Sequence, residues 1–312
     1  MTMDLLTDRR SVRLAADEFG RGGSRRPRAL LLTALACERD AVVRHIAGCR
    51  PLALSGPMTV EIGQFDSGAG PWMVFVGEMG RSNIVAANLT SSAISAIRPR
   101  VVLMVGIAGG RREVRRGDVV AAEKVYYYES GKEELRVVIP LPLPGRYRGA
   151  LLRFRSRKVF LPSPIVYNAS GNLVREARRA LHDQEWRSSI IDLEVGQQPT
   201  AYIGPVASGG VVVKARGRAE KIISTHYPDA LAVEMEGAGF SQAVQAVSGL
   251  DGMVVRGISD RRVDKGPMSD PVWQPRASVH AAGLAFAVLG HYVSSREAPT
   301  SARRSPRQQH RR

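Results

Sequence analysis

Three carboxylates of this chain stand directly after apolar runs that have the character of buried strands. Glu38 follows the first of these runs, Glu236 the second and Asp260 the third. A carboxylate is costly to bury, so at the end of such a strand it is solvated, paired or used. In an open α/β sheet the strand ends at one edge line a single crevice, and these side chains can therefore meet although they are far apart in sequence.

Two carboxylates that face each other across a pocket suit the cleavage of a glycosidic bond. One donates a proton to the leaving group while the other activates water, and the transition state resembles a sugar cation. A third carboxylate could accept hydrogen bonds from two sugar hydroxyls. The small-residue loop 106–110 ends a fourth strand and belongs to the same predicted edge.

The elements that must position these side chains alternate between buried strands and helices. We expect strands over residues 29–37, 60–65, 72–78, 101–110, 117–128, 201–213, 231–235 and 253–258. We expect helices over residues 38–46, 83–97, 172–181, 219–226, 237–246 and 277–292. This alternation predicts an α/β fold with a mixed central β-sheet flanked by helices on both faces.

A length of 312 residues with 44% hydrophobic and 24% charged residues is typical of a globular protein. We expect one domain over 29–293 with a proline-rich insertion over 130–200, a flexible basic segment over 1–28 and a disordered basic tail over 294–312. No run is long and apolar enough for a signal peptide or a membrane span, so we expect a cytoplasmic protein without a membrane partner. Cys37 and Cys49 have no metal-site spacing, and we expect reduced thiols and neither metal nor organic cofactor.

The formal net charge of +16 is of the size seen in nucleic-acid-binding proteins. Much of the excess lies in the two terminal segments, and arginine outnumbers lysine, as codon bias alone could produce. We interpret these arginines as solvated. Binding of nucleic acid or another acidic partner by the tails is the alternative, and it would depend steeply on salt.

Four segments resemble the methylthioadenosine/S-adenosylhomocysteine nucleosidases of the nucleoside phosphorylase superfamily. The similar segments, in the order the family has them, are ALACE ending at Glu38, VGIAGG followed by RRGDVV, AVEMEG ending at Gly237, and VVRGISD ending at Asp260. They extend over residues 29–130 and 200–292. The segment KVYYYESGK, 124–132, looks most like domains found in bacterial conflict systems, alone or fused to NACHT modules.

The resemblance implies a role for each matching residue. Asp260, oriented by Ser259, would protonate the five-membered ring of a purine, and Glu38 would activate the attacking water. Glu236 would hold the ribose 2′- and 3′-hydroxyls. The remaining implied contacts are Met235 against the ribose, backbone groups of Val212 and Val213 at the base edge, and close backbone approach at Ala108 and Gly109.

The resemblance further implies hydrolysis of the N-glycosidic bond of a purine nucleoside or nucleotide, with adenine as the expected base, in a homodimer or larger homo-oligomer. A phosphate-dependent phosphorylase and a module that senses a nucleoside without turning it over are the alternatives. The phosphorylases place Arg and Ser where this chain has Met104 and Ile107. Phosphate would be poorly held there, so we expect water as the nucleophile. Val212 stands where the nucleosidases usually have an aromatic residue that stacks on adenine, so the identity of the base stays open.

Two further charged groups have competing interpretations. Lys214, Arg216 and Arg218 form either a solvated helix start or a site for a 5′-phosphate. Arg256 lies inside an apolar strand and needs a partner, and we predict a buried salt bridge with Glu234. The 5′ substituent of the substrate stays open.

Overall fold

The computed structural model describes residues 2–20, 25–67, 70–138, 155–163, 165–182, 185–194, 196–211, 217–261 and 270–292. The expected tail over 294–312 lies outside these ranges, as do Val212, Val213, Lys214 and Arg216. Within them, no helix is long and apolar enough to cross a membrane.

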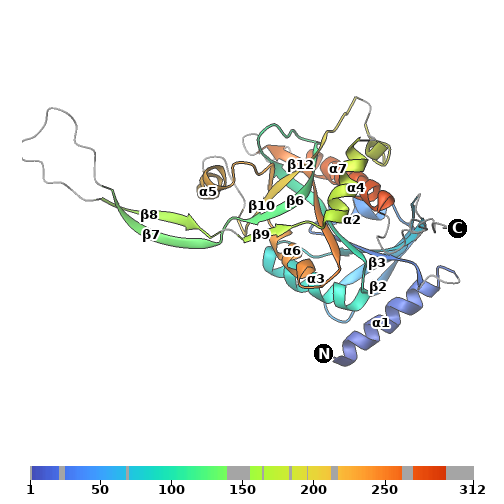
Figure 1. The fold of residues 1–312 in the computed structure, drawn as a ribbon. Coiled ribbons are helices and arrows are strands. Elements are labelled where there is room, and N and C mark those ends of the chain that lie inside the picture. The colour runs from blue at the N-terminus through green and yellow to red at the C-terminus, as the bar shows by residue number, and fades with distance from the viewer. Residues whose placement is uncertain are drawn as a thin grey trace, which may run out of the picture.

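The centre of the molecule is one large mixed sheet, which confirms the predicted α/β class (Figure 1). Its strand order is β11 (Ala232–Glu234), β10 (Ala201–Ser208), β6 (Val119–Tyr127), β12 (Asp251–Arg261), β5 (Val101–Gly110), β1 (Arg28–Thr33), β4 (Gly70–Glu78), β3 (Thr59–Ser67) and β2 (Ala47–Ala53). β9 (Ile165–Asn168) pairs with β6. The central strands β4, β1, β5 and β12 run parallel to one another, so their carboxyl ends share one edge.

Helices cover both faces of this sheet, as predicted. One core contains side chains of α3 (Asn83–Ile97), α6 (Gly237–Gln245) and α1 (Thr2–Asp17) packed on the sheet. The core on the other face contains side chains of α2 (Ala36–Val43), α4 (Gly171–His182) and α7 (Asp270–His291). α5 (Arg218–His226) packs in a smaller cluster beyond β10, and a 3₁₀ turn η2 spans Glu185–Arg187.

The strand β5 and the helix α3 have the bounds that the sequence predicts. Residues 101–105 of β5 are buried without interruption, because helices cover the sheet above and below it. α3 begins after Ser82, whose side chain accepts a hydrogen bond from the Val85 amide at 3.4 Å, and it ends at Arg98 in a left-handed conformation.

The expectation of a flexible basic segment over 1–28 is wrong for α1. Val12 and Ala16 are fully buried, and the Asp8 carboxylate accepts hydrogen bonds from the Ser55 amide at 2.6 Å and from its hydroxyl at 2.7 Å. These inward positions recur every four residues, so the buried face of the helix is narrow. Arginines flank this face, and the sequence therefore shows no clear apolar periodicity.

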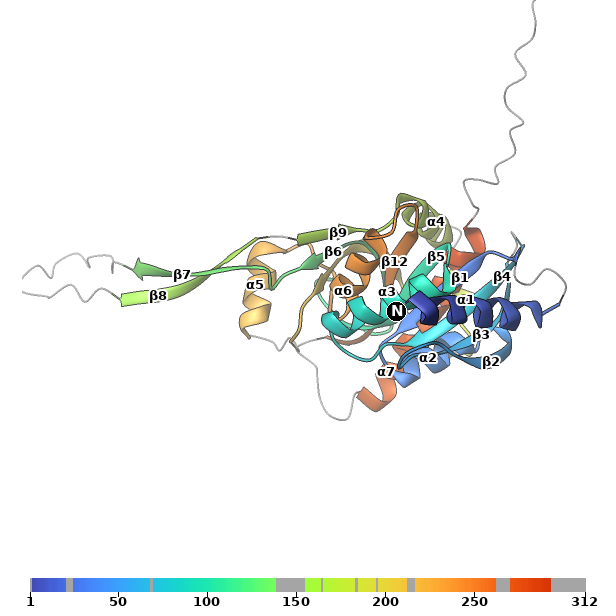
Figure 2. The same cartoon turned by 90° about the horizontal axis from the view of Figure 1, so that it is seen from below.

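The region of the expected 130–200 insertion begins with an arm that stands apart from the sheet. β7 (Gly131–Val138) and β8 (Arg155–Pro162) form a two-stranded antiparallel ribbon, which projects away from the body (Figures 1 and 2). The ribbon, together with β2 and β9, was not among the predicted strands. These strands lie at edges or outside the sheet, where none of their described side chains is buried and the apolar pattern is weak.

Candidate active site

Glu38 lies in the first turn of α2, just beyond the end of β1, and its side chain is buried. Its Oε2 accepts hydrogen bonds from the amides of Ala34 at 2.7 Å and Leu35 at 2.9 Å, and its Oε1 from that of Ile107 at 2.8 Å. Burial raises the pKa of Glu38, while the nearby Arg256 charge and the three amides act against that rise. Glu38 is therefore a carboxyl group held in place by three amides, and burial raises its pKa.

Arg256 is the cation at the centre of the site. It is fully buried in β12 and forms ion pairs with Glu234 and, at 3.4 Å, with Glu236 Oε2. The predicted salt bridge between Arg256 and Glu234 is thus confirmed. Glu234 also accepts hydrogen bonds from the amides of Glu236 at 3.0 Å and Gly237 at 2.7 Å, so it fixes the first turn of α6.

Glu236 occupies the N-cap position of α6 and is 6% exposed. Burial raises the pKa of Glu236 to about 7; Arg256 opposes this shift, and the charges of Glu234 and Glu38 add to it. The Ser82 amide approaches its Oε1 at 3.4 Å. Near neutral pH this carboxyl can therefore be present in both protonation states.

Asp260 and Ser259 lie where β12 has an irregularity in its pairing with β5. Asp260 is opposite Gly109, and both Asp260 and Ser259 are buried. Ser259 Oγ lies 3.5 Å from Asp260 Oδ2, a long contact that is compatible with the expected orienting role. Gly109 also pairs with Val233 of β11, so the strand leading to Glu236 and the end of β12 meet at β5.

The structure brings Glu38, Glu236 and Arg256 together around Gly106. A Cβ atom at Gly106 would overlap both the Glu38 carboxylate and the Arg256 guanidinium, so only glycine lets β5 pass between them. Asp260, Ala108 and Gly109 lie at the same end of the neighbouring strands, and Met235, which is partly exposed, lies between Glu234 and Glu236. The predicted residues within the described ranges thus share one edge.

Arg218, proposed from sequence as a 5′-phosphate ligand, is otherwise engaged. It forms an ion pair with Glu133 of β7, and its guanidinium lies 5.9 Å from the centre of the Phe160 ring in β8. Arg218 therefore ties α5 to the arm.

Sequence reasoning missed a hydrogen-bonded group that supports Glu236. Ser82 has a φ of 107°, which is rare for a residue with a side chain. The next residue, Asn83, accepts hydrogen bonds through Oδ1 from Ser208 Oγ at 3.1 Å and the Gly239 amide at 2.9 Å. Ser208 Oγ in turn accepts from the Ala238 amide at 3.1 Å. Ser-Asn before a predicted helix is an N-cap signal, but its partners are not visible in sequence.

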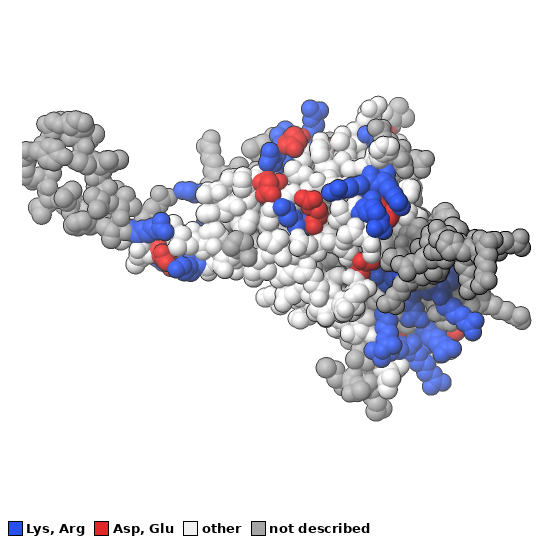
Figure 3. Space-filling model, in the orientation of Figure 1, with Lys and Arg blue, Asp and Glu red and all other residues white. Residues whose placement is uncertain are grey.

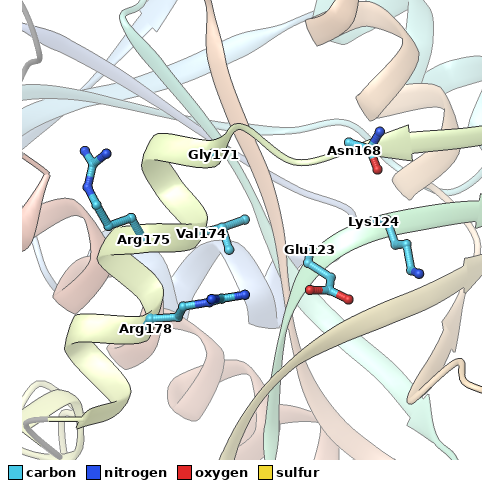
Figure 4. A pocket seen from close by; sticks show the side chains of 7 residues that line it. All are labelled: Glu123, Lys124, Asn168, Gly171, Val174, Arg175 and Arg178. Atoms are coloured by element: carbon cyan, nitrogen blue, oxygen red, sulfur yellow. The ribbon is translucent and has the colours of Figure 1, made fainter.

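A separate depression of about 430 Å³ lies between β6, β9 and the start of α4 (Figure 4). It is lined by Glu123, Lys124, Asn168, Gly171, Val174, Arg175 and Arg178. None of the candidate catalytic residues contributes to it. Lys124 pairs with Asp229 at 3.6 Å and Arg175 with Glu176 at 2.9 Å.

Across the part of the chain that the structure describes, no group of three His, Cys, Asp or Glu side chains could hold a metal ion.

Known proteins resemble this chain in sequence and in fold. It is 27% identical over 186 residues to the ATP nucleosidase Cap17 of Escherichia coli strain KTE188, an alignment that covers 57% of this chain and 34% of that protein. The chain thus spans about a third of the length of this relative.

Two solved structures share the fold at low sequence identity. A 5′-methylthioadenosine/S-adenosylhomocysteine nucleosidase from Colwellia psychrerythraea, in complex with adenine, has a TM-score of 0.63 and 21% identity and covers 86% of this chain and 96% of its own. The futalosine hydrolase of Helicobacter pylori has a TM-score of 0.62 and 20% identity and covers 84% and 97%. The family model of the phosphorylase superfamily matches residues 38–290, and the chain belongs to this superfamily.

Proposed function

We propose that the protein hydrolyses the N-glycosidic bond of a purine nucleoside or nucleotide, with adenine as the preferred base. The observation that carries this proposal is the convergence of buried Glu38, Glu236 and Asp260 on one sheet edge. Such an edge offers an acid, a base and a ribose ligand within one crevice. The ATP nucleosidase relative and the adenine-bound nucleosidase with the same fold support the choice of base.

In the proposed reaction Asp260 donates a proton to the five-membered ring of the base. The bond between C1′ and the base nitrogen breaks, and its electron pair leaves with the base. Water attacks C1′ and gives its proton to Glu38, so the products are the free base and a sugar with a 1-hydroxyl group. Glu38 suits this role because its raised pKa makes it a stronger base than a solvated glutamate. Glu236 holds the 2′- and 3′-hydroxyls.

The charges of the site favour water over phosphate as the nucleophile. Arg256 is the cation nearest to Glu38, but its charge is already shared by Glu234 and Glu236. A phosphate dianion would have to approach the carboxylates of Glu38 and Glu236. The positions where phosphorylases hold phosphate carry the apolar side chains of Met104 and Ile107, which offer it neither a positive charge nor a hydroxyl group. This argument supports a nucleosidase rather than a phosphorylase.

An exposed apolar surface beside Ser82 supports the proposed homo-oligomer. Ile84 is 77% exposed on α3, and Ile165 and Val166 are exposed on β9. A groove of about 370 Å³ between them is lined in part by Tyr127 and Gln242. Large exposed apolar side chains around a groove are typical of subunit interfaces. Ile84→Asp should shift the chain to a smaller species in light scattering; an unchanged mass would place the interface elsewhere.

The direct test is release of free base from adenine and guanine nucleosides and nucleotides, each with and without phosphate. Base release that needs no phosphate and is lost in Asp260→Asn and Glu38→Gln would support the proposal, and the best substrate would identify the 5′ group. A requirement for phosphate would replace it with a phosphorylase. Tight binding without release from any compound would favour a nucleoside-sensing module.

A further inference from the structure

The outer side of α1 is part of a continuous basic surface. This α1 basic surface (Figure 3) consists of arginines from α1, from the segment that enters β1 and from the end of α3: Arg9, Arg10, Arg13, Arg25, Arg26, Arg28 and Arg98. Arg9 and Arg28 donate to carbonyl oxygens at the end of α3, those of Ser95 at 3.3 Å and Ile97 at 2.7 Å. Figure 3 shows Lys and Arg side chains gathered over the region where α1 lies in Figure 1.

Among the residues that the structure describes, few acids lie near this surface to balance its charge. The carbonyl oxygens that Arg9 and Arg28 contact carry no formal charge, and Asp8 faces inward to Ser55. Glu18 pairs with Arg50, which leaves Asp17 as the acid near Arg28. Burial and the charges of Arg13 and Arg98 together lower the pKa of Arg28, so these arginines are close enough to repel one another. An anionic partner bound to this surface would relieve the repulsion among the arginines.

Two leucines project from the same outward face of the helix. Leu6 is 60% and Leu14 58% exposed, whereas Val12 and Ala16 face the core. Leu6, Arg10 and Leu14 are spaced four residues apart, so they lie in one row along the helix and the two leucines are about 12 Å from each other. Leucines that are exposed beside arginines can enter the boundary between headgroups and acyl chains while the arginines contact lipid phosphates.

We propose that the α1 basic surface docks on an anionic lipid bilayer. Arg10 and Arg13 contact lipid phosphates, and Leu6 and Leu14 enter the boundary between headgroups and acyl chains. Nucleic acid would use the arginines but leave both leucines in water. A second copy that met this surface with its own α1 basic surface would be repelled, because both surfaces are positive (Figure 3). The prediction of no membrane partner rested on the lack of a spanning segment, and this mode of binding needs none.

The test is co-sedimentation of the full chain with lipid vesicles. We expect binding to vesicles of phosphatidylcholine with about 30% phosphatidylglycerol, weakening with salt, and little binding to phosphatidylcholine alone. Each arginine near an anionic surface raises affinity about fivefold, so Arg10→Glu/Arg13→Glu should lower it at least tenfold. Leu6→Asn/Leu14→Asn should also lower it, but leave its salt dependence.

The matched control is Arg178→Glu/Lys221→Glu, which makes the same change of charge at exposed positions on α4 and α5. It should bind vesicles nearly as the wild type does, and all three variants should keep the wild-type melting temperature and base release. Equal losses in the control and the α1 variant would overturn the proposal, as would full binding by the leucine variant. Binding to a short DNA duplex in place of anionic vesicles would overturn it in favour of nucleic acid.

Discussion

Arg256 is a single buried cation among three buried glutamates, and the surrounding residues relieve the excess negative charge. Glu38 accepts three backbone amides, Glu234 accepts two, and Glu236 has one at 3.4 Å from Ser82. Glu236 has the fewest donors, and burial raises its pKa to about 7, so it takes up a proton as the pH falls below neutral.

Glu236→Gln tests this assignment through stability. The pKa of Glu236 is raised from 4.5 to about 7 in the folded state, so folding favours the protonated form. Stability is therefore retained below about pH 4.5 and lost as pH rises toward 7. The neutral amide should be as stable as the wild type at low pH and more stable at pH 8, by on the order of 2 kcal/mol, in denaturant unfolding. Base release should be lost.

Glu113→Gln is the control for this pH dependence. Glu113 is exposed and faces Arg112 at 3.4 Å, so its replacement should change stability by no more than about 0.5 kcal/mol at any pH. A Glu236→Gln variant that is less stable than the wild type at pH 8 would contradict this prediction. It would mean that the attraction between Arg256 and the Glu236 carboxylate outweighs the repulsion among the glutamates and the cost of burying this charge.

Arg256→Met removes the cation while keeping a long side chain. The glutamates are then left without their central counter-charge, and we expect a loss of about 3–5 kcal/mol at pH 8. The loss should shrink at pH 5, because burial raises the pKa of Glu236 to about 7 and this carboxyl is then protonated. Unfolding in urea at the two pH values measures this. An equal loss at both would show that packing, rather than charge, makes Arg256 important.

At the scale of elements, the contact between α3 and α6 decides where Glu236 lies. Asn83 at the start of α3 bonds to Gly239 and to Ser208, and Ser208 bonds to Ala238. Gly239 packs so closely that an added Cβ would overlap the Asn83 carbonyl oxygen. The first turn of α6 is thus held from two sides, and Glu236 directly precedes it.

Gly239→Ala should push this turn away from α3. We expect a loss of stability of about 1–3 kcal/mol from overpacking and a raised KM in base release, because the ribose ligand moves. Gly290→Ala is the matched control, since an added Cβ there meets nothing within 4 Å inside α7. It should raise stability by about 0.5–1 kcal/mol and leave KM unchanged. An unchanged KM in Gly239→Ala would contradict the prediction, because it would show that the packing of α6 on α3 does not affect ribose binding.

At the scale of the whole molecule, the sequence correctly predicts those strands and helices that have clear apolar patterns. β5 and α3 are covered on several sides, so their patterns are clear, and parallel strands around β5 bring the predicted carboxylates to one edge. Ser82 and Asn83 could not be found in this way, because their roles depend on β10 and α6. The helix α1 was missed because its buried face is narrow and the rest of its surface is basic.

The packing of α1 on the body gives the last prediction. Val12 is fully buried there, so Val12→Ala removes apolar contacts and leaves a cavity, at a cost of about 2 kcal/mol. Leu14→Ala changes a side chain on the same helix that is 58% exposed and should alter stability by no more than about 0.5 kcal/mol. Denaturant unfolding followed by circular dichroism measures both. If residues 2–17 were instead a flexible segment, the two variants would be equally stable, whereas a loss confined to Val12→Ala makes α1 part of the cooperative fold.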